Sequence, residues 1–243
     1  MKSRFGQAWE LLFDPPVAHR GLWSRGGAPE NSLAAFQCAC AAGYGIELDV
    51  QLSADGEAMV FHDDELARLT GQPGRLREHA AADLMEMRLG GGEERIPTLL
   101  EALAVIGRRA MVHIELKTPL GEVGPLEQRV HEVLIDHAGP ACVIGFNPYS
   151  HAWFAERFPG VLRGFDVEKG WPAPRRDPGS ELAEVPLARA HFLALSVDLL
   201  DHPETATARA AGTPVLAWTI RSAEQRAQLA GACDNIIFEG FAA

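Results

Sequence analysis

Short apolar runs of strand length alternate with segments of helical spacing along most of the chain. The runs are rich in Val, Ile and Leu. They predict strands at residues 17–20, 45–52, 111–117, 142–147, 161–167, 192–199, 214–220 and 235–238, with an additional run at 57–62. Helices are expected at residues 32–42, 99–106, 127–137, 150–158, 182–190, 203–211 and 223–230.

The eight strand and helix repeats predict an α/β fold, a somewhat distorted (β/α)8 TIM-type barrel. The run at 57–62 follows the second strand after a short turn at Asp55-Gly56. We therefore expect an extra hairpin strand that pairs antiparallel with the second barrel strand. A doubly wound open sheet is the alternative if the strand count is off by one. No linker or break in composition divides residues 1–243, so a single domain is expected.

The composition excludes several classes of protein. The chain is 47% hydrophobic and 23% charged, with a net charge of −11 and no long basic run, which argues against a nucleic-acid partner. No apolar stretch approaches the ~18 residues of a membrane-spanning helix. Gln7, Glu10 and Asp14 interrupt the N-terminal apolar positions, so we expect no signal peptide and a cytoplasmic protein. The cysteine spacing fits neither a zinc site nor a disulfide scaffold and predicts free thiols.

The second predicted strand carries two carboxylates among apolar neighbours. Glu47 and Asp49 are two residues apart, so their side chains point to the same side of the strand. Two anions on one face repel each other, and a buried charge needs a counter-charge or a bound metal. This strand therefore predicts half of a cation site.

The third barrel strand repeats this alternation. His113, Glu115 and Lys117 share one face, and apolar residues occupy the other. If the apolar face packs on the helices, the polar face points into the barrel, whose interior is usually apolar. Glu115 then joins Glu47 and Asp49, and three carboxylates suit a hard cation, Mg²⁺ or Ca²⁺, better than zinc. The alternative is that each carboxylate pairs with Arg or Lys, as Glu115 does if Lys117 lies beside it.

Two histidines follow predicted strands near these carboxylates. His19 ends the first strand and is followed by Arg20, and His62 ends the hairpin strand. Histidine transfers protons near neutral pH, and arginine can bind two phosphate oxygens at once. Two histidines and an arginine beside a cation therefore indicate a phosphoryl site. The other histidines lack this setting and are expected to be structural or at the surface, with His113 a candidate for a deeper barrel layer.

These residues belong to a longer string that resembles the glycerophosphodiester phosphodiesterase family. The specific part covers about residues 17–117, and the likeness thins beyond it. Its main pieces are His19-Arg20-Gly21, Pro29-Glu30-Asn31-Ser32, Ile46-Glu47-Leu48-Asp49-Val50, Phe61-His62-Asp63, Ile96-Pro97-Thr98-Leu99 and Glu115-Leu116-Lys117. The order of the pieces makes the combination specific, although no single piece is.

The resemblance implies a metal-dependent enzyme that hydrolyses glycerophosphodiesters to sn-glycerol 3-phosphate and an alcohol. Small-molecule glycerophosphodiesters are its expected partners. The implied residues are Glu47, Asp49 and Glu115 for one divalent ion, Mg²⁺ or Ca²⁺, His19 and His62 for acid/base catalysis, and Arg20 and Lys117 for phosphate oxygens. Trp218 either packs against substrate carbons or belongs to the core. The nucleophile, water or the glycerol hydroxyl, stays open, as do the metal, the alcohol, the oligomeric state and which histidine is the acid.

The chain departs from the family pattern at four places. The departures are Ser32 in place of Thr, Arg68-Leu69-Thr70 in place of Arg-Thr-Thr, Gly145-Phe146 in place of Ser-Phe, and Phe238-Glu239 in place of Thr-Asp. The last two fall where the alcohol is expected to bind, so they bear on substrate preference.

Three other functions compete with this interpretation. A lysophospholipase D or a sphingomyelinase D-like enzyme would use the same catalytic residues, but it calls for an exposed apolar lip. A non-catalytic phosphate-binding barrel has no need for both His19 and His62. A Schiff-base aldolase would use Lys117, but nearby anions keep a lysine charged and make it a poor nucleophile.

Overall fold

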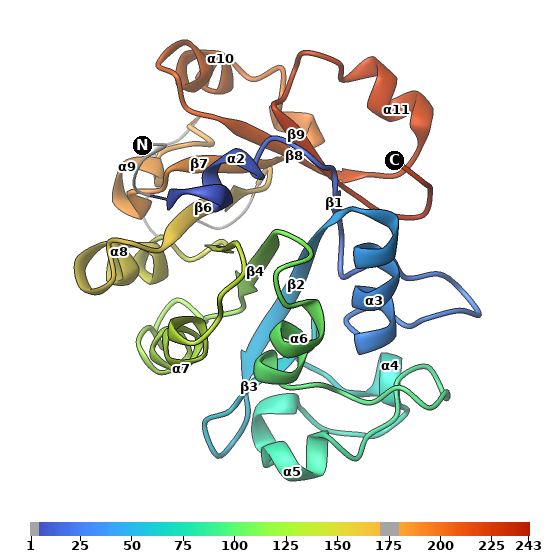
Figure 1. Cartoon of the computed structure of the whole chain (residues 1–243). Helices are drawn as coiled ribbons and strands as arrows, with labels where there is room; N and C mark the ends of the chain where they lie inside the picture. The colour runs from blue at the N-terminus through green and yellow to red at the C-terminus, as the bar shows by residue number, and fades with distance from the viewer. Residues whose placement is uncertain (1–4, 171–179) are drawn as a thin grey trace.

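The computed structural model describes residues 5–170 and 180–243 and is drawn in Figure 1. Its strands follow the predicted apolar runs, two of them, 45–52 and 235–238, residue for residue. They are β1 (Val17–Ala18), β2 (Gly45–Leu52), β3 (Ala58–Val60), β4 (Val112–Leu116), β5 (Ala141–Ile144), β6 (Leu162–Val167), β7 (Phe192–Ser196), β8 (Val215–Ile220) and β9 (Asn235–Phe238).

Eight parallel strands form a closed ring in the order β1-β9-β8-β7-β6-β5-β4-β2, and β1 pairs with β2 to close it. The hairpin strand β3 lies outside the ring and pairs antiparallel with β2, with Val50 opposite Val60. The predicted (β/α)8 barrel with an extra hairpin strand is therefore confirmed, and the open-sheet alternative is wrong. The first strand is shorter than predicted, because the backbone turns at Arg20 into the left-handed region with φ 58°.

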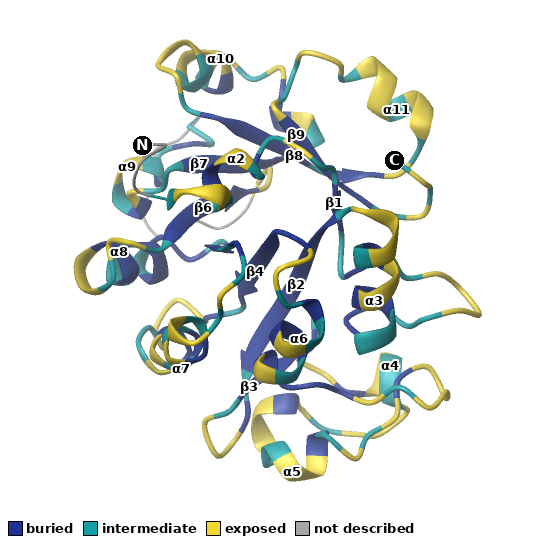
Figure 2. Ribbon diagram, in the orientation of Figure 1, coloured by how far each residue is buried: buried dark blue, intermediate teal, exposed yellow. Residues whose placement is uncertain are grey.

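Alternating residues divide each strand between two cores. Ile46, Leu48 and Val50 face outward and pack with the surrounding helices in the larger apolar cluster. Inward-facing residues at the N-terminal end of the barrel form a second cluster, which Trp9 and Leu12 close from below. Figure 2 shows the resulting pattern, with buried strands inside and helices that are exposed mainly on their outer faces, while α11 is exposed over most of its surface.

The main helices surround the ring, as Figure 1 shows. They are α3 (Leu33–Ala42), α6 (Leu99–Ile106), α7 (Pro125–Ile135), α8 (Pro148–Arg157), α10 (Pro203–Ala210) and α11 (Ala223–Gln228). Local chemistry sets their ends. The Ser32 hydroxyl accepts from the backbone N–H of Ala35 at the start of α3, and Gly43 ends this helix with φ 77°.

Shorter helices fill the remaining connections. They are α2 (Gln7–Glu10), α4 (Ala67–Thr70), η1 (Leu76–Glu78), α5 (Ala81–Leu84), α9 (Val185–Ala188) and η2 (Val197–Leu199). Of these, α4, η1 and α5 lie between β3 and α6 and pack around a small apolar core of their own that includes Phe61, Leu66 and Leu84. Within the described residues, no helix has the length and apolar character needed to cross a lipid bilayer. All four cysteines are free, as their spacing predicts.

Candidate active site

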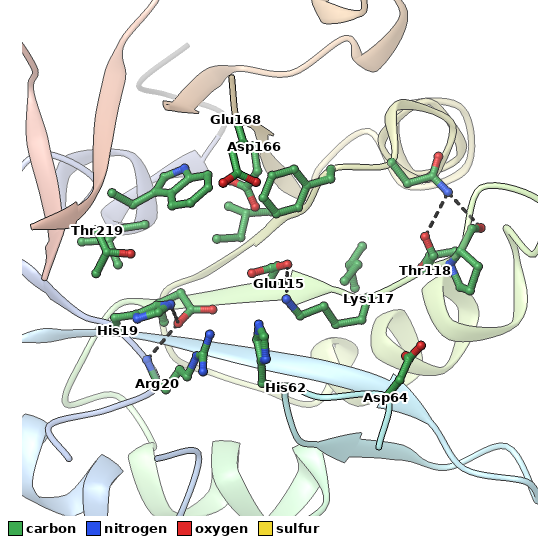
Figure 3. A pocket seen from close by; sticks show the side chains of 18 of the residues that line it. His19, Arg20, His62, Asp64, Glu115, Lys117, Thr118, Asp166, Glu168 and Thr219 are labelled. Atoms are coloured by element: carbon green, nitrogen blue, oxygen red, sulfur yellow. Dashed lines mark hydrogen bonds and ion pairs between the residues drawn. The ribbon is translucent and has the colours of Figure 1, made fainter. Parts of the chain in front are cut away.

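A cavity of about 600 Å³ opens at the C-terminal ends of the barrel strands. Its walls carry nearly all of the predicted site residues, including the two histidines, Arg20, Lys117 and Trp218. Figure 3 shows His19, Arg20 and His62 along one side of Glu115, and Asp166 and Glu168 along the other. This is the end of a (β/α)8 barrel where active sites are built.

The three predicted metal-ligating carboxylates meet at the base of this cavity. Asp49 and Glu115 are paired in the register of β2 and β4, and Glu47 lies one inward position below Asp49. Each of the three offers an oxygen atom, and these oxygens lie within 4.8 Å of one another. All three residues are buried, and Asp49 is further held by Asn31, whose amide nitrogen donates to its Oδ2 at 2.8 Å.

The cluster is only partly neutralised by the chain itself. Lys117 Nζ lies 3.0 Å from Asp49 Oδ1 and 2.6 Å from Glu115 Oε1. Glu47 receives one hydrogen bond, from the backbone N–H of Arg20, and its Oε1 is buried without a partner. Burial, followed by repulsion from Asp49 and Glu115, raises the pKa of Glu47 well above its usual range. An excess of buried negative charge with a free oxygen fits a divalent cation.

Lys117 is held in its charged form. Burial acts to lower its pKa, but Asp49 and Glu115 outweigh burial and raise the pKa of Lys117 above its usual value. An amine nucleophile must lose its proton to attack a carbonyl carbon. The environment of Lys117 therefore argues against the Schiff-base alternative. The other alternative, in which each carboxylate pairs with Arg or Lys, holds for Asp49 and Glu115, because both contact Lys117.

His19 is oriented by a residue from the far end of the chain. Its Nδ1 lies 2.7 Å from Glu239 Oε2, and its Nε2 lies 3.9 Å from Glu47 Oε2. Arg221 Nε in turn donates to Glu239 Oε1 at 2.8 Å. The hydrogen bond from His19, supported by charge from Arg221 and Arg20, lowers the pKa of Glu239 to about 2. Glu239 is thus an anion that accepts a hydrogen bond from the Nδ1–H of His19. The Nε2 atom of His19 then faces the cluster.

His62 has a corresponding carboxylate. Its Nδ1 lies 2.7 Å from Asp63 Oδ1, and Asp63 is bound by the guanidinium of Arg68. Arg68 also donates to both oxygens of Glu30, which accepts from Arg20 NH1 at 2.7 Å. Burial alone would raise the pKa of Glu30, but these bonds from Arg68 and Arg20 lower it. An ion-pair chain therefore connects the two histidine-bearing loops.

Trp218 lies between the cavity and the apolar interior, and its predicted contact with substrate carbons stays a prediction. It lines the cavity, and its ring packs edge-on against Phe146 with centroids 5.6 Å apart. His113 is fully buried in the barrel below Glu115, and burial lowers its pKa to about 4, which agrees with the deeper layer expected for it.

Four groups near the histidines were not predicted in these positions. Glu239 binds His19 and accepts from Arg221, and Asp63 binds His62 and accepts from Arg68. The family comparison pointed to Glu239 as a departure near the alcohol, but its side chain contacts a histidine instead. An acidic residue directly after His62 was the visible signal for Asp63, whereas no local pattern signals Arg221.

Fold and site together define a class: closed (β/α)8 barrels whose mouth combines a buried carboxylate cluster with two histidines that are each bonded to a carboxylate. Within this class, the chain belongs to the glycerophosphoryl diester phosphodiesterase family, whose model matches residues 19–239.

Individual relatives agree with this assignment. A glycerophosphodiester phosphodiesterase from Caldanaerobacter subterraneus is 35% identical over 144 residues, which make up 55% of this chain and 58% of that protein. The chain thus aligns with little more than half the length of this curated relative. A phosphodiesterase from Oleispira antarctica, solved with its product sn-glycerol-3-phosphate, is 29% identical with a TM-score of 0.83, covering 96% of this chain and 94% of the other. A Galdieria sulphuraria structure, 21% identical with a TM-score of 0.79, covers 93% and 94% and shares the fold.

Proposed function

We propose that this protein hydrolyses glycerophosphodiesters to sn-glycerol 3-phosphate and an alcohol. One observation carries the proposal: both histidines line the same cavity as the carboxylate cluster, each with its Nδ1 bound by a carboxylate. The family assignment supports the substrate class. The Oleispira antarctica structure with sn-glycerol-3-phosphate supports the identity of the product.

In this proposal Glu47, Asp49 and Glu115 hold one divalent cation, Mg²⁺ or Ca²⁺. The unpartnered Oε1 of Glu47 and the charge excess of the cluster support this assignment. Such an ion, when bound, polarises a phosphoryl oxygen and neutralises its charge. Arg20 and Lys117 add positive charge around the same oxygens, which stabilises the additional negative charge of the transition state.

The two histidines move the protons. The Nε2 atom of one histidine takes the proton of the attacking hydroxyl as a new P–O bond forms. The Nε2 atom of the other gives a proton to the leaving oxygen as the old P–O bond breaks. We assign the proton transfer to Nε2 of His19 and of His62, since Glu239 and Asp63 each bind the Nδ1 atom.

The proposal is tested by assaying glycerophosphocholine hydrolysis. We expect release of choline and sn-glycerol 3-phosphate, and a loss of roughly 10²- to 10⁴-fold in kcat for His19→Ala and for His62→Ala. His79→Ala, outside the cavity, is the matched control and should keep the wild-type rate. Release of choline phosphate would mean that the proposal names the wrong P–O bond. A wild-type rate in either site variant would mean that this histidine takes no part in the chemistry.

The nucleophile is decided by a second measurement on the same reaction. Attack by the glycerol hydroxyl gives a cyclic phosphate before the final product, whereas attack by water does not. Phosphorus NMR during turnover separates the two routes, because only the first gives a transient cyclic species.

The lipid-directed alternative has no specific support in the described part of the chain. The large apolar side chains exposed on the described residues belong to three separate segments and form no continuous lip. They are Leu100, Leu120 and Ile135. A small, water-soluble diester is therefore the better-supported substrate.

A further inference from the structure

Gln51 lies on the same side of β2 as Glu47 and Asp49, because inward positions alternate along a strand. It is the last inward residue of β2 and is 6% exposed. The proposed chemistry uses the two carboxylates but gives no role to a neutral amide beside them. A buried amide needs hydrogen-bond partners, and the partners of Gln51 indicate what it does.

The Gln51 amide bonds to two main-chain carbonyl groups. Its Nε2 donates to the carbonyl oxygen of Phe61 at 2.9 Å and to that of Asp63 at 2.8 Å. An amide NH2 group has two hydrogens, so both are used. The two carbonyls belong to the residues directly before and after His62. Within the described part of the chain, no other group donates to either of them.

His62 lies outside the helices and strands, between β3 and α4. The Phe61 N–H donates to the Asp49 carbonyl at 3.0 Å, and the described residues after Phe61 form no further backbone bond to β2 before α4 begins. The His62 side chain is 32% exposed, so packing alone does not fix it. Bonds to the carbonyl on each side of His62 restrict the backbone dihedrals from which its side chain begins.

The same bonds place the carboxylate that binds the His62 ring. Asp63 Oδ1 lies 2.7 Å from His62 Nδ1, while the Asp63 carbonyl accepts from Gln51. The amide therefore sets the position of the ring, and the carboxylate sets its rotation. Because Gln51 and Asp49 belong to one strand, the ring is fixed relative to the carboxylate cluster. Figure 3 shows His62 among the residues that line the cavity.

We propose that Gln51 is a positioning residue for His62. It acts through the main chain on both sides of the histidine and not by contact with the reacting atoms. Loss of its two bonds frees the loop and moves Nε2 of His62 away from the proton that it transfers. A displacement of about 1 Å in such a group can cost on the order of 10²-fold in rate. The inference rests on the proposed function, since it assumes that His62 transfers a proton.

A second buried amide of this kind lies at the other end of the barrel. Asn235, at the start of β9, is 8% exposed, and its Nδ2 donates to the carbonyls of Leu12 and Pro15 at 3.0 and 2.9 Å. It matches Gln51 in burial and in the number of these bonds, but it lies away from the histidines. Asn235→Leu is therefore the matched control for Gln51→Met, since each exchanges an amide for an apolar side chain of similar size.

The first test measures glycerophosphocholine hydrolysis by Gln51→Met. We expect kcat per folded molecule to fall roughly 10- to 100-fold with KM nearly constant, because the groups that bind substrate stay in place. Asn235→Leu should lower the urea midpoint and keep the wild-type kcat. Gln51→Asn keeps the amide on a stem shorter by one methylene, so it should fold even if Gln51→Met does not, and should lose about tenfold. A wild-type kcat in both Gln51 variants would overturn the inference.

A double-mutant cycle with His62→Ala separates positioning from a general effect on the site. If Gln51 acts through His62, Gln51→Met should lower kcat in the wild type but change the residual kcat of His62→Ala by less than about twofold. An equal loss in both backgrounds would mean that Gln51 supports another part of the site, and it would overturn the inference while leaving the proposed function intact. A wild type inactive on glycerophosphocholine would instead contradict the proposed function itself.

Discussion

The two ends of the barrel interior are built from the same strands but have opposite characters. At the N-terminal end, inward positions such as Leu162, Phe192 and Leu216 form a dry cluster closed by Trp9. At the C-terminal end, the inward positions carry buried carboxylates and polar atoms without partners. Packing stabilises the first end, whereas the second gathers charge that burial alone makes unfavourable.

The difference between the two ends separates the residues that stabilise the barrel from those that we propose for the chemistry. On β4 the change occurs between Met111, which belongs to the apolar cluster, and Glu115, which lines the cavity. An interior selected for stability alone would be apolar along its whole length. We therefore expect substitutions at the two ends to separate activity from stability.

Removing charge from the polar end should have the largest effect. Glu47→Gln takes away an oxygen ligand and should lower kcat/KM by roughly 10³-fold, as should excess EDTA on the wild type. In EDTA at pH 8 the same variant should melt at a higher temperature than the wild type, because it relieves repulsion from Asp49 and Glu115. Glu93→Gln, at an exposed site, is the control for both measurements. Full activity in EDTA would rule out the metal.

At the apolar end, Phe192→Ala should have the opposite effect: it should lower stability and leave activity nearly unchanged. The ring is fully buried inside the barrel, and its loss should lower the free energy of unfolding by about 3 to 5 kcal/mol. Urea denaturation measures the change, and Leu100→Ala at an exposed site provides the control. The activity per folded molecule should change little. If Phe192→Ala abolished turnover while remaining folded, the separation of the two ends would be wrong.

His113 lies at the boundary and should make stability pH-dependent. The unfolded chain binds a proton at this residue near pH 6.5, but burial delays protonation in the folded state to about pH 4. Between these values unfolding takes up a proton, so stability falls as the pH falls, by about 1.4 kcal/mol per unit and ~3 kcal/mol in total. His113→Gln should remove this contribution from the profile of urea midpoints, whereas buried His151, whose pKa burial also lowers to about 4, should keep its own. His79→Gln should leave the slope unchanged.

The smallest effect is expected at the contact between Glu239 and His19. Glu239→Gln keeps an oxygen that accepts from Nδ1 but removes the charge that stabilises a protonated ring, so kcat should fall about tenfold. Glu239→Ala removes the acceptor too and should cost about 100-fold, with KM nearly constant in both. Glu224→Gln on α11 is the control. Equal kcat values for wild type and Glu239→Ala would contradict an orienting role.

Much of the fold follows from local pattern. The apolar run at Gly45–Leu52 matches β2 residue for residue, and Leu99–Ile106 matches α6, because capping and alternation are encoded in adjacent residues. The same alternation predicts that Glu47, Asp49 and Glu115 lie together, and their carboxylate oxygens do. Their roles, and those of the histidines, stay predictions until the variants are measured.

Long-range contacts could not be predicted in this way. The helices α4 and α5 have four residues each and depend on packing around Phe61, so no helical periodicity signals them. The hydrogen bond between His19 and Glu239 joins residues 220 positions apart. Asp166 did carry a signal, since it is a charged residue at an inward position of β6, as Glu115 is on β4.

The ring is closed by two residues, Val17 and Ala18, which pair with β2 on one side and β9 on the other. During synthesis β1 leaves the ribosome long before β9 exists, so the ring cannot close until β9 emerges. His19 follows β1 and its partner Glu239 follows β9. A growing chain therefore carries most of the polar residues of the site before His19 and Glu239 can meet, and the candidate site is completed only late in biosynthesis.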